Sequence, residues 1–138
     1  MKGVNWIGVI IAAIVGWLIG YVWYDMAFGA TWLAEMKMTE EQAQAAGMAP
    51  MFLGLANGLV TCIGLGLVVP RLENSLMGGL KTGLLAGIFF AGTTSAMNYI
   101  YGGHSMTLTL INVGYILVMY AVAGAIIGGV KFGKKADA

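Results

Sequence analysis

"NWIGVIIAAIVGWLIGYVWY", residues 5–24, is the stretch of sequence that decides the fold. A membrane-spanning helix needs about 20 consecutive, mostly apolar residues, and this stretch reaches that length without a charged side chain. It lies where a cleaved signal peptide would lie, but its apolar run exceeds the roughly 7–15 residues of a signal-peptide core. The sequence therefore predicts a retained transmembrane helix over about residues 5–25.

Three further stretches meet the same criterion, at about residues 51–69, 76–98 and 106–130. Pro50 precedes the first of them and Pro70 follows it, and proline suits the first turn of a helix and stops a helix beyond its end. We therefore expect an all-α fold, an integral membrane four-helix bundle that forms a single domain over residues 1–138.

The composition supports lipid as the solvent of this fold. The chain is 59% hydrophobic and 9% charged, whereas a soluble domain carries about 25% charged residues. The net charge of +1 provides no basic surface for nucleic acid. Cys62 is the lone cysteine, so no disulfide forms within the chain, and we expect it to behave as a small hydrophobic residue.

The connection between the first two spans, residues 26–50, predicts short helices over about residues 30–47. The segment Thr39-Glu40-Glu41-Gln42 matches a capping box, which predicts a helix from Glu40 to Ala46 that ends at Gly47. Before it, three apolar residues share one helical face: Trp32, Leu33 and Met36. This short segment either lies at the headgroup boundary or covers the end of the bundle.

Basic residues predict the orientation, because cytoplasmic loops carry an excess of Lys and Arg. With the spans above, one side holds Lys2, Arg71, Lys81, Lys131, Lys134 and Lys135. The other side holds only Lys37. The sequence therefore predicts a multi-pass protein of the cell membrane with both termini cytoplasmic, and the asymmetry argues against a dual-topology dimer.

Glycine pairs at a spacing of four recur in every span. They are Gly16/Gly20, Gly54/Gly58, Gly79/Gly83/Gly87 and Gly124/Gly128. Small residues at this spacing let membrane helices approach closely. We expect a tightly packed bundle and a homo-oligomer or a larger membrane complex, with membrane lipids as the other partners.

Polar residues inside a membrane are the strongest pointers to function. The candidates for a ligand site or proton relay lie in the outer half of the bundle: Asp25, Asn98, His104, Asn112 and Tyr115. Asp25 and His104 form a possible pair, and the alternative is that both are interfacial residues in contact with headgroup water. The aromatic residues around Asp25 suit an interfacial belt better than a ligand cage.

No catalytic motif stands out, so we expect no enzymatic activity and no cofactor. One histidine and one cysteine do not make a usual zinc site, and we expect no metal. The sequence favours a homo-oligomeric membrane protein or an accessory subunit. The alternative is a small-solute or ion channel or transporter with an outward-facing polar cavity.

The sequence also resembles a known family. The resemblance is carried by Asn5-Trp6, Gly20, Trp23-Tyr24, Phe28-Gly29, Trp32 and Thr39-Glu40-Glu41. These residues are similar to the start of the domain of unknown function 1761 family, and "LINVGYILVMYAVAGAIIG", residues 110–128, is similar to its last span. The resemblance implies an integral membrane protein with about four spans. It implies no activity and no site residues.

Overall fold

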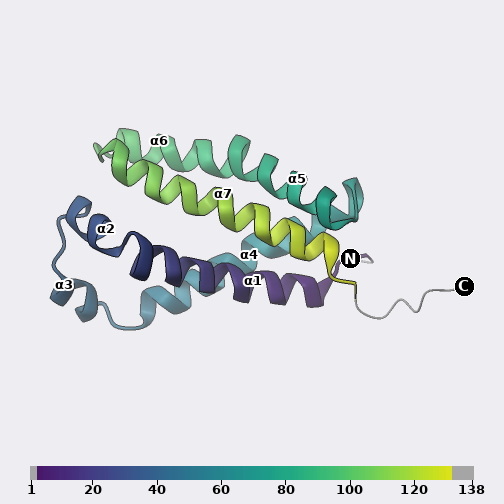
Figure 1. Cartoon of the computed structure of the whole chain (residues 1–138), viewed down its shortest axis with the longest axis horizontal. Coiled ribbons are helices and arrows are strands. Elements are labelled where there is room, and N and C mark those ends of the chain that lie inside the picture. Colours follow the sequence, from purple (N-terminus) through teal and green to yellow (C-terminus); the bar gives the residue numbers. More distant parts are fainter. Residues whose placement is uncertain (1–2, 132–138) are drawn as a thin grey trace, which may run out of the picture.

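Hydropathy decides where the long helices run in the computed structural model, which describes residues 3–131. Four helical stretches are long and apolar enough to cross a membrane: Trp6–Ala27, Ala49–Leu72, Leu76–Tyr101 and Met106–Gly129. They lie side by side (Figure 1), and this part of the chain contains no strand. The predicted all-α membrane bundle is confirmed.

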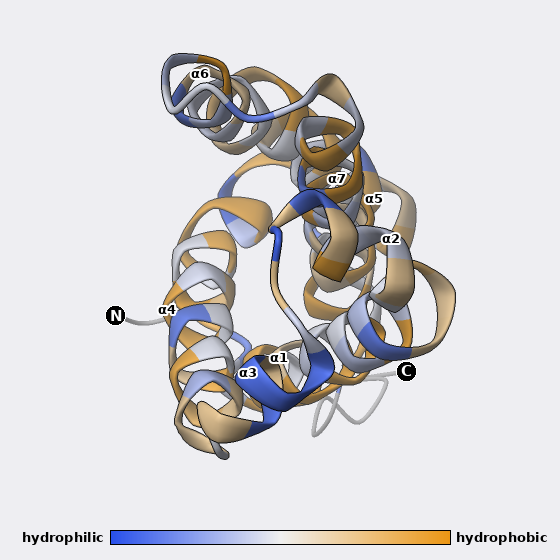
Figure 2. Cartoon of the chain, turned by 90° about the vertical axis from the view of Figure 1, so that its left-hand side faces the viewer, coloured by the Kyte–Doolittle hydropathy of each residue, from blue (hydrophilic) through white to orange (hydrophobic). Residues whose placement is uncertain are grey.

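The two ends of the bundle differ. The terminal end holds both ends of the described chain, and the opposite, loop end holds the short helices α2 (Gly29–Glu35) and α3 (Glu40–Ala45) (Figure 1). Viewed from the loop end, hydrophilic residues gather on α3 and the adjoining connections, while the long helices are mostly hydrophobic (Figure 2). This division is typical of a bundle whose ends meet water and whose sides meet lipid.

The first span begins at Asn5, whose side chain accepts a hydrogen bond from the Gly8 N–H at 2.9 Å. It consists of α1 (Trp6–Tyr21) and a π-helical segment, η1 (Val22–Ala27). The Phe28 N–H closes the π turn on the Trp23 carbonyl at 2.9 Å. The next helix, α2 (Gly29–Glu35), then continues from η1 at a changed angle (Figure 1).

The predicted capping box is confirmed at α3 (Glu40–Ala45). Thr39 Oγ1 accepts from the Gln42 N–H at 3.2 Å, and the Thr39 N–H donates to Gln42 Oε1 at 2.9 Å. Gly47 ends the segment with φ +63°, a left-handed conformation that glycine adopts without steric cost.

The second span, α4 (Ala49–Leu72), begins with Pro50 in its first turn. The prediction that Pro70 ends this helix was wrong, because the helix continues to Leu72. A proline in the last turn removes only one hydrogen bond. The Arg71 guanidinium also donates to the Leu67 carbonyl, one turn earlier on the helix.

The third span runs through α5 (Leu76–Ala86), a second π-helical segment, η2 (Gly87–Gly92), and α6 (Thr93–Tyr101). The predicted boundary at residue 98 was therefore short by three residues. The fourth span is α7 (Met106–Gly129), capped by Ser105, whose hydroxyl accepts from the Leu108 N–H at 3.1 Å. Ser105 also donates to the Glu35 carboxylate, and this bond ties α2 to the start of α7.

Glycines bring α5 and α7 into backbone contact. A Cβ atom added to Gly83 would overlap the Tyr120 carbonyl oxygen, and one added to Gly124 would overlap the Gly79 carbonyl oxygen. One added to Gly128 would overlap the Ser75 oxygen. No larger residue fits this interface without moving a helix, and the backbones gain dispersion contacts and Cα–H···O contacts instead.

The remaining glycines of the predicted pairs divide into two groups. A Cβ atom on Gly16 would lie 3.1 Å from Met119, one on Gly20 3.1 Å from the Tyr115 hydroxyl, and one on Gly87 3.0 Å from Tyr120. In contrast, a Cβ atom on Gly54 would meet nothing within 4 Å. One on Gly58 would meet only the Met119 methyl group, at 3.8 Å. Gly54 and Gly58 therefore do not bring α4 close to a neighbouring helix within this chain.

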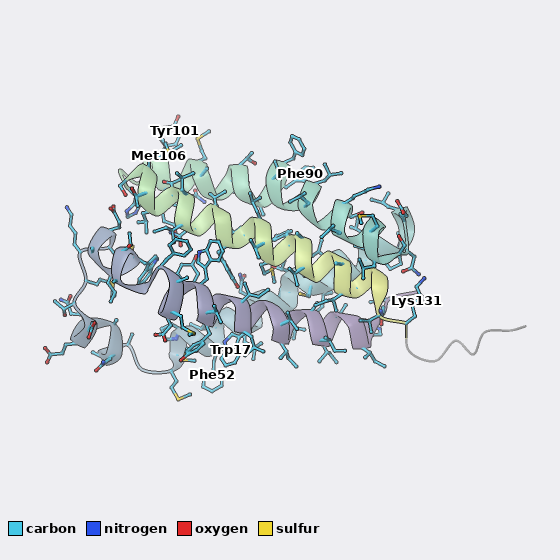
Figure 3. All side chains as sticks on the ribbon, viewed as in Figure 1. Trp17, Phe52, Phe90, Tyr101, Met106 and Lys131 are labelled. Atoms are coloured by element: carbon cyan, nitrogen blue, oxygen red, sulfur yellow. The ribbon has the colours of Figure 1, made fainter. Side chains whose placement is uncertain are left out.

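The buried core lies in the terminal half of the bundle. Its fully buried side chains come from α1, α4 and α7 and include Val9, Cys62, Val69 and Ile127. Asn5 closes this end by donating to the carbonyl oxygens of Ile127, at 3.0 Å, and Val130. Large apolar side chains such as Phe52 and Phe90 point outward (Figure 3), where they are 63% and 74% exposed.

Candidate functional site

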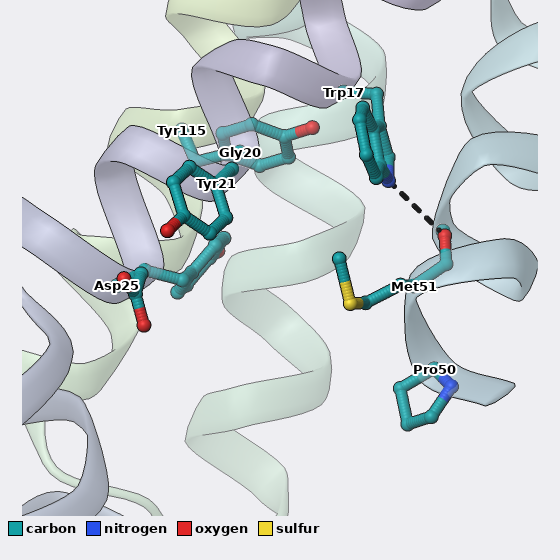
Figure 4. Close-up of a pocket in the computed structure, with 9 residues that line it drawn as sticks. Trp17, Gly20, Tyr21, Asp25, Pro50, Met51 and Tyr115 are labelled. Carbon is teal, nitrogen blue, oxygen red and sulfur yellow. Dashed lines mark hydrogen bonds between the residues drawn. The ribbon is translucent and has the colours of Figure 1, made fainter. Parts of the chain in front are cut away.

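A cavity of about 430 Å³ lies toward the loop end, between the first span, the start of α4 and α7. Residues from all three helices line it: Trp17, Gly20, Tyr21, Tyr24, Asp25, Pro50, Met51, Gly54 and Tyr115. Figure 4 shows Pro50 and Met51 across the cavity from Tyr21 and Asp25. Its size falls in the range of about 300–1,000 Å³ that small-molecule sites occupy.

The cavity exists because α1 and α4 pack closely in only one half. The buried residues of α4 are Cys62, Leu65, Gly66 and Val69, all in its second half. There, a Cβ atom on Gly66 would lie 2.6 Å from Val9. In the first half of α4, Gly54 has open space beside it. The two helices therefore separate toward the loop end.

Three polar aromatic groups of the lining are engaged within the protein. Trp17 Nε1 donates to the Met51 carbonyl at 3.2 Å (Figure 4), which spans the cavity wall from α1 to α4. The Tyr115 hydroxyl donates to the Gly16 carbonyl at 3.2 Å. The Tyr24 hydroxyl donates to Asn112 Oδ1 at 2.6 Å. These side chains therefore present mainly their rings to the cavity.

The π-helical segment η1 directs two aromatic side chains toward α7. Trp23 Nε1 donates to the Ile111 carbonyl at 3.0 Å. The ring of Tyr24 meets that of Tyr115 edge-on, with the centroids 5.3 Å apart. We expected both residues in an interfacial belt, but their polar atoms bond within the bundle. Tyr21, 50% exposed, keeps its hydroxyl free of protein partners among residues 3–131.

Asp25 supplies the one charged side chain of the lining. It is solvent-exposed, and no hydrogen bond or ion pair from the described part of the chain engages its carboxylate. A carboxylate beside aromatic rings, with no cation in the lining, gives the cavity a negative end and an apolar body.

The five predicted site residues are not gathered in one place. Asp25 and Tyr115 line the cavity, and Asn112, only 6% exposed, lies behind it, where its amide donates to the Leu108 carbonyl at 3.0 Å. Asn98 and His104 are exposed and do not line it.

Among residues 3–131, no ion pair or hydrogen bond joins Asp25 to His104, so their pairing stays a prediction. The imidazole of His104 packs edge-on against Tyr99, with the centroids 5.4 Å apart. His104 follows α6, and α7 lies between α6 and α1 (Figure 1).

The α4 part of the lining was not predicted from the sequence: Pro50, Met51 and Gly54. Trp17 was likewise not expected to line a site. A signal was present: Trp17, Tyr21, Tyr24 and Asp25 follow one another at i, i+4, i+7 and i+8, the spacing of one helical face. In residues 3–131, no group of three or more His, Cys, Asp or Glu side chains lies close enough together to hold a metal ion.

Comparisons with known proteins place the chain in a family. No curated protein matches it, and no solved structure matches it. A family model described as "Protein of unknown function (DUF1761)" matches residues 7–128. This match covers all four membrane-spanning helices except Trp6 at the start of the first and Gly129 at the end of the fourth. The chain therefore belongs to the DUF1761 family of proteins of unknown function.

Proposed function

We propose that this protein is a non-enzymatic integral membrane protein that binds a small solute in the loop-end cavity. The observation that supports this function is the cavity itself, about 430 Å³, in a bundle whose α5 and α7 pack in backbone contact. Below the cavity, side chains such as Val9, Ala12 and Cys62 are fully buried and fill the terminal half. This filling favours a binding site or an alternating-access transporter over an open channel.

We further propose that the solute reaches the cavity from outside the cell. Arg71, Lys81 and Lys131 lie toward the terminal end, and Lys2, Lys134 and Lys135 lie outside the described residues. An excess of basic residues on one side favours the cytoplasm for that side. The loop end, with Asp25, then faces the opposite compartment.

Cysteine labelling tests whether the cavity admits solutes from water. In the variant Gly54→Cys, the new thiol lies in the cavity, and its Cβ meets nothing within 4 Å. The matched control is Gly64→Cys, on the same helix, also with open space but outside the cavity. The native Cys62 is fully buried and should stay unlabelled.

We expect N-ethylmaleimide to label Gly54→Cys much faster than Gly64→Cys, because the thiolate reacts and a thiol in hydrocarbon stays protonated. The readout is the mass shift of protein reconstituted in nanodiscs. Equal and slow labelling of both variants would contradict a water-accessible cavity and the function proposed from it.

A second proposed role is assembly with another copy of the chain through α4. Asn57 is exposed on a membrane-spanning helix. A polar amide facing hydrocarbon is costly unless another helix bonds to it. We expect light scattering in mild detergent to give a dimer that Asn57→Leu weakens, and a monomeric native chain would contradict this role.

A further inference from the structure

We propose that the loop-end cavity binds an organic cation, with an ammonium group beside the Asp25 carboxylate and an apolar body against the aromatic rings. This inference rests on the proposed solute-binding function and names its ligand class. It follows from the charge of the lining, from the state of its hydrogen-bonding groups and from the character of its surface.

The charge of the lining selects against anions. Asp25 carries the only formal charge among the lining residues, and the lining contains no Lys, Arg or His. The neighbouring basic residue on the loop side, Lys37, is exposed beyond α2 and does not line the cavity. A cation therefore gains attraction from the carboxylate, while an anion meets repulsion and no compensating donor.

The hydrogen bonds select against sugars and other polyhydroxylated solutes. Such ligands need many donors and acceptors, because their hydroxyl groups lose water on binding. Trp17, Tyr24 and Tyr115 already direct their polar atoms to Met51, Asn112 and Gly16. The side-chain polar groups left for a ligand are the Asp25 carboxylate and the Tyr21 hydroxyl.

The surface that remains is suited to an ammonium ion attached to hydrocarbon. A cation over the face of Trp or Tyr is attracted by the ring quadrupole, and the lining holds Trp17, Tyr21, Tyr24 and Tyr115. Met51 adds a flexible, polarisable side chain that adapts to irregular shapes. Gly54 contributes no side chain, and a Cβ atom there would meet nothing within 4 Å, so room is left for the ligand body.

Two sources supply this chemistry at the loop end of the bundle. One is a free organic ammonium ion from the aqueous phase. The other is the ammonium headgroup of a membrane lipid, since Asp25 lies at the end of a span where headgroups gather. The test below uses a bilayer of phosphatidylglycerol, which has no ammonium group, so that each source is added separately.

The experiment measures how well a ligand protects Gly54→Cys from N-ethylmaleimide, a neutral reagent that does not compete for the carboxylate. The first probe is benzyltrimethylammonium. Its controls are neopentylbenzene, in which carbon replaces the charged nitrogen, and phenylmethanesulfonate, which is an anion. The second probe is phosphatidylcholine added to the phosphatidylglycerol bilayer. Each probe is tested with and without Asp25→Asn, and Glu41→Gln is the matched control for a general loss of negative charge at the loop end.

We expect benzyltrimethylammonium or phosphatidylcholine to slow labelling of Gly54→Cys, while neopentylbenzene and phenylmethanesulfonate do not. Asp25→Asn should raise the half-protecting concentration by at least roughly fivefold, the effect of one contact ion pair in water-like surroundings. Glu41→Gln should leave it unchanged. Attraction of the cation to the anionic bilayer is the same with Asp25 and with Asp25→Asn. It therefore cancels when their half-protecting concentrations are compared.

The outcomes separate this inference from the function on which it rests. Unlabelled Gly54→Cys without any probe overturns the accessible cavity itself. If Gly54→Cys is labelled readily and neither ammonium probe slows the labelling, the cation inference is overturned and the accessible cavity stands. The same follows if neopentylbenzene slows labelling as much as benzyltrimethylammonium does. Protection that survives Asp25→Asn unchanged also overturns it, because Asp25 is exposed and its substitution disturbs no packing.

Discussion

Gly83→Ala tests the backbone contact between α5 and α7, on which the bundle depends. The added methyl carbon would overlap the Tyr120 carbonyl oxygen and lie 2.9 Å from the Tyr120 carbonyl carbon and 3.3 Å from Gly124 Cα. All three are backbone atoms, which cannot rotate aside as a side chain does. The two helices must therefore move apart.

The magnitude follows from that separation. A gap of about 0.5–1 Å forfeits roughly a quarter to a half of the dispersion energy of each contact that it opens. Overpacking a close interface costs about 1–3 kcal/mol, and we expect the upper part of this range because backbone meets backbone. A loss of about 3 kcal/mol lowers the ratio of folded to unfolded protein by roughly 150-fold.

Steric trapping of doubly biotinylated protein in bicelles measures this free energy of unfolding in a lipid environment. Gly64→Ala is the matched control, because its Cβ meets nothing within 4 Å, and it should change the free energy by less than about 0.5 kcal/mol. Our reasoning is refuted if Gly83→Ala is as stable as the native chain, or if Gly64→Ala loses as much as Gly83→Ala does.

Four further variants probe the two ends of the bundle and its topology. Asn5→Ala removes the cap of α1 and the hydrogen bonds to the end of α7. Steric trapping should show that the free energy of unfolding falls by about 1–3 kcal/mol. An unchanged free energy would refute the stabilising role of these bonds. Asn112→Leu leaves the Tyr24 hydroxyl without its acceptor and should cost about 0.6–1.7 kcal/mol, whereas a gain in stability would speak against that bond. A membrane-impermeant maleimide applied to intact cells should label Glu41→Cys and spare Lys131→Cys, and the reverse pattern would invert the proposed orientation.

The membrane spans were predictable because length and hydropathy alone determine them. Residues 5–25, 76–98 and 106–130 each fall within three residues of the observed helices. The capping box at Thr39 was equally readable, since it depends on residues only three positions apart. Pro70 misled because its effect depends on how much helix follows it, and only two residues do.

The π-helical segments were not predictable from the sequence. Neither η1 nor η2 contains a residue that marks it, and each extends an apolar helix without interruption. Yet η1 determines that Trp23 and Tyr24 reach α7, because a widened turn changes the face on which the following residues lie. π-Helical turns occur frequently at functional sites, and η1 adjoins the cavity.

The candidate site was predictable in depth but not in direction around the bundle. Hydropathy places Asp25, Asn98, His104 and Asn112 at similar levels in the membrane. Which of them meet depends on the order in which the helices pack, and that order puts α7 between α1 and α6. The lining residue Gly54 was expected to contact another helix, because a glycine pair looks the same in sequence whether it packs or leaves space.

The central claim, that an organic cation occupies the space between α1 and α4, is tested most directly by crystallography. Crystals grown in lipidic mesophase with 4-iodobenzyltrimethylammonium would reveal the iodine by its anomalous scattering. We predict an anomalous peak inside the cavity lined by Trp17, Tyr21 and Met51, with the ammonium group beside the Asp25 carboxylate. A cavity closed by contact of α4 with α1, or iodine bound only elsewhere on the protein, would contradict the claim.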